Sequence, residues 1–254
     1  MKETKCFQDH ASFHAGCRRV LEERPSRVAG IPVPFLRFSS IDVVVRPPAT
    51  DFSRSVQLVY RNSVATRVAR RGFDLAVASA ALMAAAPILA VAAATIWLED
   101  RGPVFFKQRR VGRFKRNFTI LKLRTMSVTD CDDRLSPTSP FDRRVTRVGR
   151  FLRRFSIDEL PQFINVIRGE MTLVGPRPEM PFVTARYEPW QHLRHLAKPG
   201  ITCTWQITHR STIPLDRPEA TLMDINYLHR KSPLFDGMII MRTFMAIFRQ
   251  KGAY

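Results

Sequence analysis

The sequence predicts a mixed, helix-rich α/β protein that is associated with a membrane. Three observations support this fold class. Residues 75–98 form a run of 24 residues without a charged side chain. After that run, short apolar segments bounded by turn residues predict strands, and apolar residues that repeat every three or four positions predict amphipathic helices. We therefore expect a membrane helix followed by a small globular domain with amphipathic helices at the membrane interface.

The first part of the chain, residues 1–65, predicts a poorly structured N-terminal extension. Prolines and arginines are scattered through it, and it lacks the apolar core of a secretory signal peptide. Residues 41–45 could pair as a strand. Four potential zinc ligands share one helical face, but a single helix cannot surround a tetrahedral ion, so zinc is not expected. These are Cys6, His10, His14 and Cys17.

Residues 66–100 predict the membrane segment, with residues 67–74 as an approach to the uncharged run. As one helix that run would be about 36 Å long, enough for a hydrocarbon core of about 30 Å. Pro87 removes a helix hydrogen bond in its middle and predicts a kink or break. A kinked spanning helix and a re-entrant helix hairpin both fit, and basic residues on both flanks favour the re-entrant form. A buried core helix fits less well because the run is long.

The charge distribution indicates an anionic partner. The formal charge is +19, and residues 101–154 hold 16 Lys and Arg against 4 Asp and Glu. Nucleic acid, anionic headgroups and phosphorylated substrates all attract such a block. Because no nucleic-acid-reading motif is present, we do not expect nucleic acid. The positive-inside rule places the block on the cytoplasmic face, and four cysteines without a CxxC pair fit a reduced compartment.

Residues 101–254 predict the globular domain. Residues 104–106 and 118–121 have the composition of short strands, and residues 129–142, with two prolines, predict a loop. Residues 145–154 carry apolar side chains at helical spacing with arginines between them. This helix could lie at the headgroups or on the surface of the domain, and both interpretations stay open.

Residues 224–248 contain a second amphipathic stretch, which runs from Met238 onward and ends in basic residues. It could also lie at the membrane interface.

The most informative local feature is the pair of adjacent carboxylates, Asp158 and Glu159, which follows Arg153 and Arg154. Ser156 and Glu159 have the spacing of a capping box, so the carboxylates could simply start a helix. Alternatively, the two guanidiniums and the helix N-terminus would lower the pKa of Asp158 and keep it ionised for attack on phosphorus. Glu159 could then ligate Mg²⁺. The residues alone leave both interpretations open.

Further cations could clamp a phosphate. Arg177 lies in the rigid turn 175–178, and Lys122 and Arg124 share one side of a strand because residues two apart face the same way. A solvated arginine and a basic strand face are the simpler explanations. The sequence has no P-loop, dinucleotide-binding or serine-hydrolase motif, which disfavours those enzyme classes.

Eight segments follow one another in an order that is highly specific. They are 71–74 (RGFD), 102–112 (GPVFFKQRRVG), 121–126 (LKLRTM), 156–162 (SIDELPQ), 165–171 (NVIRGEM), 174–178 (VGPRP), 198–202 (KPGIT) and 252–254 (GAY). In this order they resemble the bacterial polyprenyl-phosphate sugar-1-phosphate transferases, also called monotopic phosphoglycosyl transferases. The resemblance covers roughly three quarters of the chain.

The resemblance implies that Asp158 attacks the β-phosphate of a UDP-sugar, releases UMP and passes the phosphosugar to polyprenyl (undecaprenyl) phosphate. It implies a catalytic site with Mg²⁺ on Glu159, and a re-entrant helix broken at Pro87. It also implies that the catalytic domain, residues 101–254, lies on the cytoplasmic face of the bacterial inner membrane. The implied phosphate- and substrate-binding residues are Lys122, Arg124, Arg153, Arg177 and Lys198.

Two positions depart from the family pattern. Lys198 stands where the family often has Arg, which removes a bidentate contact, and Cys203 stands where it usually has Gly. The reaction would be the first step of exopolysaccharide or glycoconjugate assembly, with glucose or galactose as the default sugar, and a homodimer is left open. The alternative function is a non-catalytic, basic, membrane-anchored scaffold for polysaccharide assembly.

Overall fold

The chain divides into two compact units, Met1–Val44 and Val45–Tyr254. The computed structural model describes residues 37–38, 41–42, 63–127, 142–208 and 217–249. The candidate zinc ligands of the extension and, apart from Asp142, the predicted loop at 129–142 lie outside these residues.

In the first unit, β1 (Arg37–Phe38) pairs antiparallel with β2 (Ile41–Asp42). The strand predicted at 41–45 is therefore confirmed for its first two residues. Everything below concerns the second unit.

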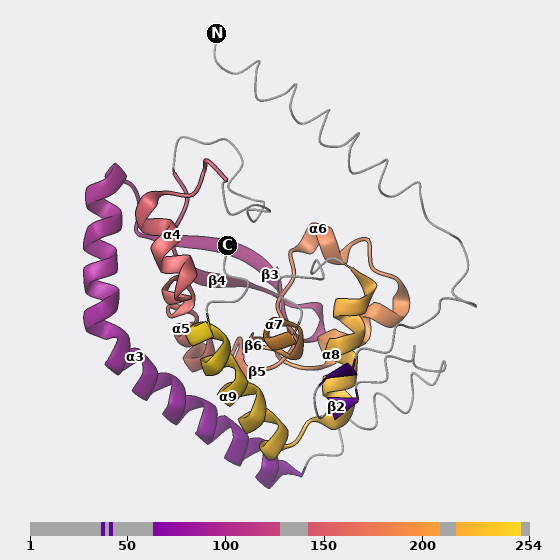
Figure 1. Cartoon of the computed structure of the whole chain (residues 1–254). Helices are drawn as coiled ribbons and strands as arrows, with labels where there is room; N and C mark the ends of the chain where they lie inside the picture. Colours follow the sequence, from indigo (N-terminus) through magenta and orange to yellow (C-terminus); the bar gives the residue numbers. More distant parts are fainter. Residues whose placement is uncertain (1–36, 39–40, 43–62, 128–141, 209–216, 250–254) are drawn as a thin grey trace. The chain divides into compact units, whose positions relative to one another are not determined.

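The longest element is helix α3 (Val64–Asp100), which borders one side of the unit and bends part-way along its length (Figure 1). The predicted approach segment is not separate, because the helix already begins at Val64, where the Ser63 hydroxyl accepts from the Thr66 amide at 3.1 Å. The helix continues through Pro87 without interruption, so the proline lies inside a bent helix.

Helix α3 is long and apolar enough to cross a membrane. Only 17% of its most apolar window is buried, and side chains such as Met83, Ile88 and Val91 are exposed. A core helix of a soluble protein would be mostly buried, so the core-helix alternative is disfavoured.

Both ends of α3 are bound to the same globular domain. Near the N-terminal end, the Arg71 guanidinium donates to the carbonyls of Val166 (2.7 Å) and Ile167 (2.8 Å), and Asp74 accepts from the Thr172 hydroxyl at 2.7 Å. At the C-terminal end, Asp100 accepts from Arg124 at 2.9 Å and Glu99 accepts from the Arg147 amide at 2.9 Å. The middle of the helix has no such polar contact among the described residues, as its uncharged sequence dictates.

The described strands of this unit form two separate two-stranded sheets. β3 (Phe105–Val111) and β4 (Asn117–Leu123) pair as an antiparallel hairpin. The two short strands predicted at 104–106 and 118–121 are confirmed, although both are longer than expected. β5 (Thr172–Val174) and β6 (Gly200–Thr202) pair in parallel. A Cβ on Gly200 would lie 2.1 Å from the Gly175 nitrogen, so only glycine permits this approach.

The remaining elements are short helices. They are η1 (Arg113–Lys115), α4 (Arg147–Arg154), η2 (Ile157–Glu159), α5 (Gln162–Arg168), α6 (Pro181–Thr184), η3 (Pro189–Leu196), α7 (Thr204–Thr208), α8 (Pro218–Arg230) and α9 (Pro233–Arg249). The mixed, helix-rich class is confirmed. The amphipathic helix predicted at 145–154 is confirmed as α4. The amphipathic stretch predicted from Met238 onward lies within α9. Pro233 separates α9 from α8, because proline cannot continue the preceding helix.

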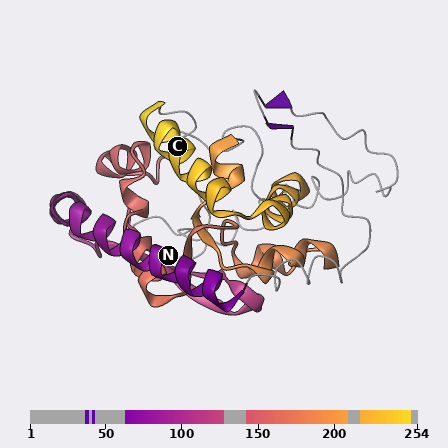
Figure 2. The same ribbon diagram turned by 90° about the horizontal axis from the view of Figure 1, so that it is seen from below.

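The apolar core lies between α3 and the hairpin. Ala78 of α3 packs with Ile120, and further along Ala92 and Ile96 pack with Leu123. α9 starts beside the N-terminal part of α3 and the two helices diverge towards their C-terminal ends (Figures 1 and 2). Because Leu121 and Leu123 are buried in β4, the intervening Lys122 is directed to the other side of the hairpin.

Candidate active site

The two adjacent carboxylates lie in the connection between α4 and α5. The capping-box prediction is wrong: Ser156 adopts a left-handed conformation (φ 55°), its side chain does not cap the turn, and residues 157–159 form the single turn η2. Helix α5 begins only at Gln162, because Pro161 has no N–H. Pro161 is the N-cap residue of this helix. Helix α5 ends at Arg168, and its C-cap residue Gly169 adopts the left-handed conformation with φ 83°.

Glu159 is held by two cations from distant parts of the chain. Its Oε1 accepts from Lys122 Nζ at 2.8 Å and from Arg177 Nη2 at 2.9 Å. Asp158 and Glu159 are only 7% and 6% exposed, and Asp158 lies within electrostatic range of Lys122. We call Lys122, Asp158, Glu159 and Arg177 the dyad cluster. Strand β4, turn η2 and the loop after β5 bring it together.

The cations of the dyad cluster are partly open to solvent, with side-chain exposures of 17% for Lys122 and 21% for Arg177. Burial lowers the pKa of Lys122, and the attraction of Glu159 offsets this only in part. Burial also lowers the pKa of Arg177, but Glu159 outweighs it and the net shift is upward. The site therefore combines the fixed guanidinium of Arg177 with the ammonium of Lys122, whose charged form is destabilised by burial. An incoming anion would stabilise that charged form.

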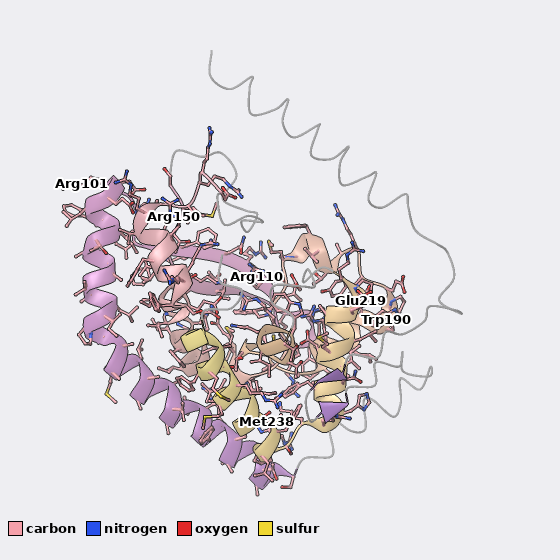
Figure 3. The ribbon with its side chains drawn as sticks, in the orientation of Figure 1. Arg101, Arg110, Arg150, Trp190, Glu219 and Met238 are labelled. Atoms are coloured by element: carbon pink, nitrogen blue, oxygen red, sulfur yellow. The ribbon has the colours of Figure 1, made fainter. Side chains whose placement is uncertain are left out.

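Arg177 is held in place by hydrogen bonds with residues that the sequence analysis did not single out. Its Nη1 donates to Gln206 Oε1 at 3.0 Å, and its carbonyl accepts from Arg194 Nη2 at 2.7 Å. Arg110 donates to the next carbonyl, that of Pro178, at 3.2 Å. In Figure 3 Arg110 lies among the packed elements, whereas Glu219 and Arg150 lie at the periphery. These contacts aim the turn that carries Arg177.

Arg194 belongs to a second group, which we call the scaffold cluster: Arg194, Asp224, Glu179 and Tyr187. The first three are buried and Tyr187 is partly exposed. Arg194 Nη2 lies 2.5 Å from Asp224 Oδ2, and both side chains are 1% exposed. Arg194 also donates to the Tyr187 hydroxyl at 2.5 Å and lies 3.9 Å from Glu179. Burial raises the pKa of Asp224 to about 6, although Arg194 acts in the opposite direction.

The other predicted phosphate ligands have different surroundings. Arg124 is buried in an ion pair with Asp100, where it anchors the end of α3. Arg153 is in the last turn of α4, and its Nε donates to Thr125 Oγ1 at 2.8 Å. Lys198 lies near Gly169, at the opposite end of α5 from Glu159. The structure thus brings Lys122 and Arg177 to Glu159, and places Arg124 and Lys198 elsewhere.

The donor set fits a magnesium ion that substrate helps to bind. Among the described residues, no group of three or more His, Cys, Asp or Glu side chains is placed to hold a metal. Mg²⁺ commonly binds through one or two carboxylates, with phosphate oxygens and water as the other ligands. Asp158 and Glu159 supply two carboxylates, although Glu159 Oε1 already accepts from two cations.

A bent apolar helix long enough to cross a membrane is joined at both ends to a small domain that holds buried carboxylates beside cations, which defines a class of helix-rich α/β proteins compatible with membrane association. Within that class the chain belongs to the bacterial sugar transferase family, whose model matches residues 65–250. The predicted family is therefore confirmed.

Curated relatives carry related names. The chain is 39% identical to the UDP-glucose:undecaprenyl-phosphate glucose-1-phosphate transferase of Caulobacter vibrioides, over 75% of this chain and 74% of the relative. It is 34% identical to the exopolysaccharide production protein ExoY of Rhizobium meliloti, over 74% and 88%. It is 36% identical to the UDP-N-acetylgalactosamine-undecaprenyl-phosphate N-acetylgalactosaminephosphotransferase of Aeromonas hydrophila, over 72% and 44%. The chain spans less than half the length of several curated relatives that it matches: the Aeromonas hydrophila protein and two others are covered to between 37% and 44% of their length.

Proposed function

We propose that this protein transfers sugar-1-phosphate from a UDP-sugar to polyprenyl phosphate. The observation that carries the proposal is the dyad cluster, in which a buried pair of carboxylates meets two partly exposed cations. Relatives named as UDP-glucose:undecaprenyl-phosphate glucose-1-phosphate transferases support it. A non-catalytic scaffold is disfavoured, because the carboxylates do not serve as the helix cap that would explain them structurally.

In the first step, a carboxylate oxygen of Asp158 attacks the β-phosphorus of the UDP-sugar. A bond forms between that oxygen and phosphorus, while the bond from the β-phosphorus to the bridging oxygen breaks. UMP leaves with the bridging oxygen and its electron pair, and Asp158 carries the phosphosugar as an acyl phosphate. In the second step, a phosphate oxygen of the polyprenyl phosphate attacks the same phosphorus. This restores the Asp158 carboxylate and gives polyprenyl diphosphate-sugar.

The cations of the dyad cluster supply the electrostatic part of this reaction. Lys122 and Arg177 are partly exposed, so the diphosphate can reach them while the carboxylates behind stay shielded from water. Charge that builds on the phosphate oxygens in the transition state meets positive groups that are already in place. Arg177 in particular needs little reorganisation, because Gln206 and Arg194 fix its side chain and its carbonyl.

Glu159 would hold Mg²⁺ jointly with the phosphate oxygens of the donor. When bound, the ion neutralises charge on the transferring phosphoryl group. Glu159 also orients Lys122 and Arg177 through the hydrogen bonds to Oε1. These two roles make Glu159 a positioning residue as well as the proposed metal ligand.

The membrane arrangement that fits this reaction is a re-entrant α3 on the cytoplasmic face of the inner membrane. Both ends of α3 contact one domain through Arg71 and Asp100, which a helix with its ends on opposite faces would not allow for a domain of this size. Cysteines introduced at Arg67 and Arg101 should both be labelled from the cytoplasmic side of inverted vesicles. Labelling of either one from the periplasm alone would contradict the re-entrant arrangement.

The nucleophile is tested without the lipid acceptor. Purified protein is incubated with UDP-glucose, UDP-galactose or UDP-N-acetylgalactosamine, and we expect release of UMP together with a phosphosugar adduct on the peptide containing Asp158. Asp158→Asn keeps the side-chain size but removes the charge, and should lower turnover with lipid present by about 10³-fold or more. Glu219→Gln, an exposed carboxylate in α8, is the control.

Three results would contradict this mechanism. They are undiminished turnover in Asp158→Asn, an adduct on a different peptide, and UMP release that requires both substrates at once. Failure of the wild-type protein to release UMP from any nucleotide sugar, with or without acceptor lipid, would favour the scaffold alternative.

A further inference from the structure

Three cations gather at the C-terminal end of α5, away from the dyad cluster. They are Arg71 of α3, Arg113 of η1 and Lys198, which precedes β6, and we call them the basic corner. A Cβ on Gly169 would lie 3.5 Å from Arg71 Nη2 and 3.8 Å from Lys198 Nζ. Both nitrogens are thus within 4 Å of one point, which places them less than 8 Å apart. The missing side chain of Gly169 leaves the space between them open.

Arg113 enters the basic corner from the tip of the β3–β4 hairpin. Its Nε donates to the Leu196 carbonyl at 3.0 Å, and its guanidinium lies 4.4 Å from the centre of the Phe114 ring. The neighbouring Lys115 and Arg116 are exposed, so positive charge continues outwards from the corner. Phe114 is also exposed, although its backbone has a positive φ of 54°, a conformation that costs energy for an aromatic residue. The tip is thus held in a specific shape.

Helix capping accounts for Arg71 but not for Lys198. Arg71 satisfies the last carbonyls of α5, those of Val166 and Ile167. Lys198 is half-buried and makes no hydrogen bond or ion pair with any residue that the structure describes. The pKa of Lys198 is lowered, first by burial, then by Arg71 and then by Arg113. The charged form of Lys198 is therefore destabilised by burial and by the neighbouring cations. The opposing carboxylate, Asp74, is already bonded to the Thr172 hydroxyl at 2.7 Å.

Exposed apolar side chains lie on α3, the helix that carries Arg71, and at the start of α9. Val64, Val68 and Phe73 of α3 are 66%, 65% and 56% exposed. Leu234 at the start of α9 is also exposed, and its neighbour Asp236 pairs with Arg70 at 3.2 Å, which keeps the two helix starts together. Apolar side chains beside fixed cations are the composition of a surface at the lipid headgroups.

We propose that the basic corner binds the phosphodiester headgroup of an anionic membrane phospholipid such as phosphatidylglycerol. The phosphate would lie between Arg71, Arg113 and Lys198, and the acyl chains would follow the apolar side chains of α3. The reactive acceptor lipid is the less suitable occupant, because α5, with seven residues or about 10 Å of helix, separates the corner from Asp158. A phosphate held there cannot reach the nucleophile. The site does not depend on the proposed transfer reaction.

The test is lipid retention by the full-length protein in neutral detergent micelles, measured by native mass spectrometry with added phosphatidylglycerol or phosphatidylcholine. We expect wild-type protein to prefer phosphatidylglycerol. The double variant Arg113→Gln/Lys198→Gln should bind phosphatidylglycerol about 30-fold more weakly, because each lysine or arginine near the headgroups favours anionic lipid about fivefold. The matched control is Lys107→Gln/Arg109→Gln, which removes the same charge from exposed positions of β3.

The control should change phosphatidylglycerol binding less than about threefold, because Lys107 and Arg109 are exposed and neither belongs to the basic corner. Equal loss in the two double variants would overturn the proposal, as would the absence of any preference in wild-type protein. Displacement of the phospholipid by millimolar inorganic phosphate, or by equimolar polyprenyl phosphate, would assign the corner to those ligands instead. Lys198→Gln alone should weaken binding about fivefold. Because Lys198 has no partner to lose, unchanged binding in this variant would also overturn the proposal.

Discussion

The dyad cluster and the scaffold cluster both pair carboxylates with an arginine, but the surroundings of the two clusters differ. In the dyad cluster, Glu159 lies between Lys122 and Arg177, and the two cations keep 17% and 21% of their side-chain surface exposed. In the scaffold cluster, Arg194 and Asp224 face each other at 2.5 Å with 1% exposure each. The chemistry of the groups is nearly identical, so exposure is what separates the two clusters.

The difference in solvent exposure distinguishes the dyad cluster, which can bind a ligand, from the scaffold cluster, which supports the fold around it. A fully buried ion pair has lost its hydration and leaves no path for a ligand, and its net contribution depends on complete pairing. The raised pKa of Asp224, about 6, reflects this desolvation. Cations that are partly exposed can instead exchange water for phosphate. The clusters are linked, because Arg194 donates to the carbonyl of Arg177 and so holds the residue that would bind substrate.

The strongest way to break the comparison is to remove the cation of the scaffold cluster. Arg194→Met leaves Asp224 and Glu179 buried without their partner, so we expect the free energy of unfolding to fall by about 3–5 kcal/mol. Urea denaturation in detergent micelles measures it, with Arg186→Met, an exposed arginine nearby, as the control. A loss no larger than that of the control would mean that the buried pair is not a support.

Neutralising Glu159 of the dyad cluster should have the opposite effect, with little loss of stability and a large loss of turnover. In Glu159→Gln, the partly exposed Lys122 and Arg177 can regain water, so the free energy of unfolding should change by less than about 1 kcal/mol. Turnover should fall about 100-fold, because the cations lose their fixed positions and Mg²⁺ loses its proposed ligand.

The magnesium dependence of turnover distinguishes the loss of fixed cation positions from the loss of a Mg²⁺ ligand. A Mg²⁺ titration of turnover should shift to higher concentration in Glu159→Gln and stay unchanged in Glu219→Gln. If half-maximal activity needs the same Mg²⁺ concentration in all three proteins, Glu159 positions the cations without binding the metal.

Local patterns in the sequence predicted much of this fold. The apolar run of α3, the two strands of the hairpin and the amphipathic α4 each depend on residues close together in the chain. The capping box failed because it requires an extended conformation at Ser156, and tertiary packing holds that residue at positive φ instead. The stretch predicted from Met238 onward lies within α9, which begins where Ser232 and Pro233 mark a turn.

The site was predicted unevenly for a similar reason. Ordered motifs resembling a known family singled out Lys122, Glu159 and Arg177, which the structure brings together. The supporting Arg194 and Asp224 are 30 residues apart and buried as a pair. Arg194 lies in η3 and Asp224 in α8, and a single charged residue in a helix gives no signal of its partner, so only the three-dimensional contact reveals such a pair.

A smaller effect would show how far the field of the scaffold cluster extends. His195 follows Arg194 in η3 and stacks on Tyr187 with ring centres 6.1 Å apart. Among the described residues its Nδ1 has no hydrogen-bond partner. Burial, reinforced by Arg194, lowers the pKa of His195 from 6.5 to about 3. The folded protein therefore keeps this imidazole neutral at pH values where the unfolded chain binds a proton.

The sign of the effect on stability follows from this difference. The stability associated with neutral His195 is complete above pH 6.5 and is lost as the pH falls from 6.5 towards 3, with about 2 kcal/mol lost at pH 5. His195→Phe keeps the stacking but cannot bind a proton, so its loss of stability between pH 7.5 and pH 5 should be smaller than that of wild type by this amount. Urea denaturation at both pH values measures the difference, with His229→Phe, an exposed histidine of α8, as the control. Identical pH dependence in His195→Phe and wild type would mean that water reaches the imidazole, and the scaffold cluster would then be less shielded than its 1% exposure indicates.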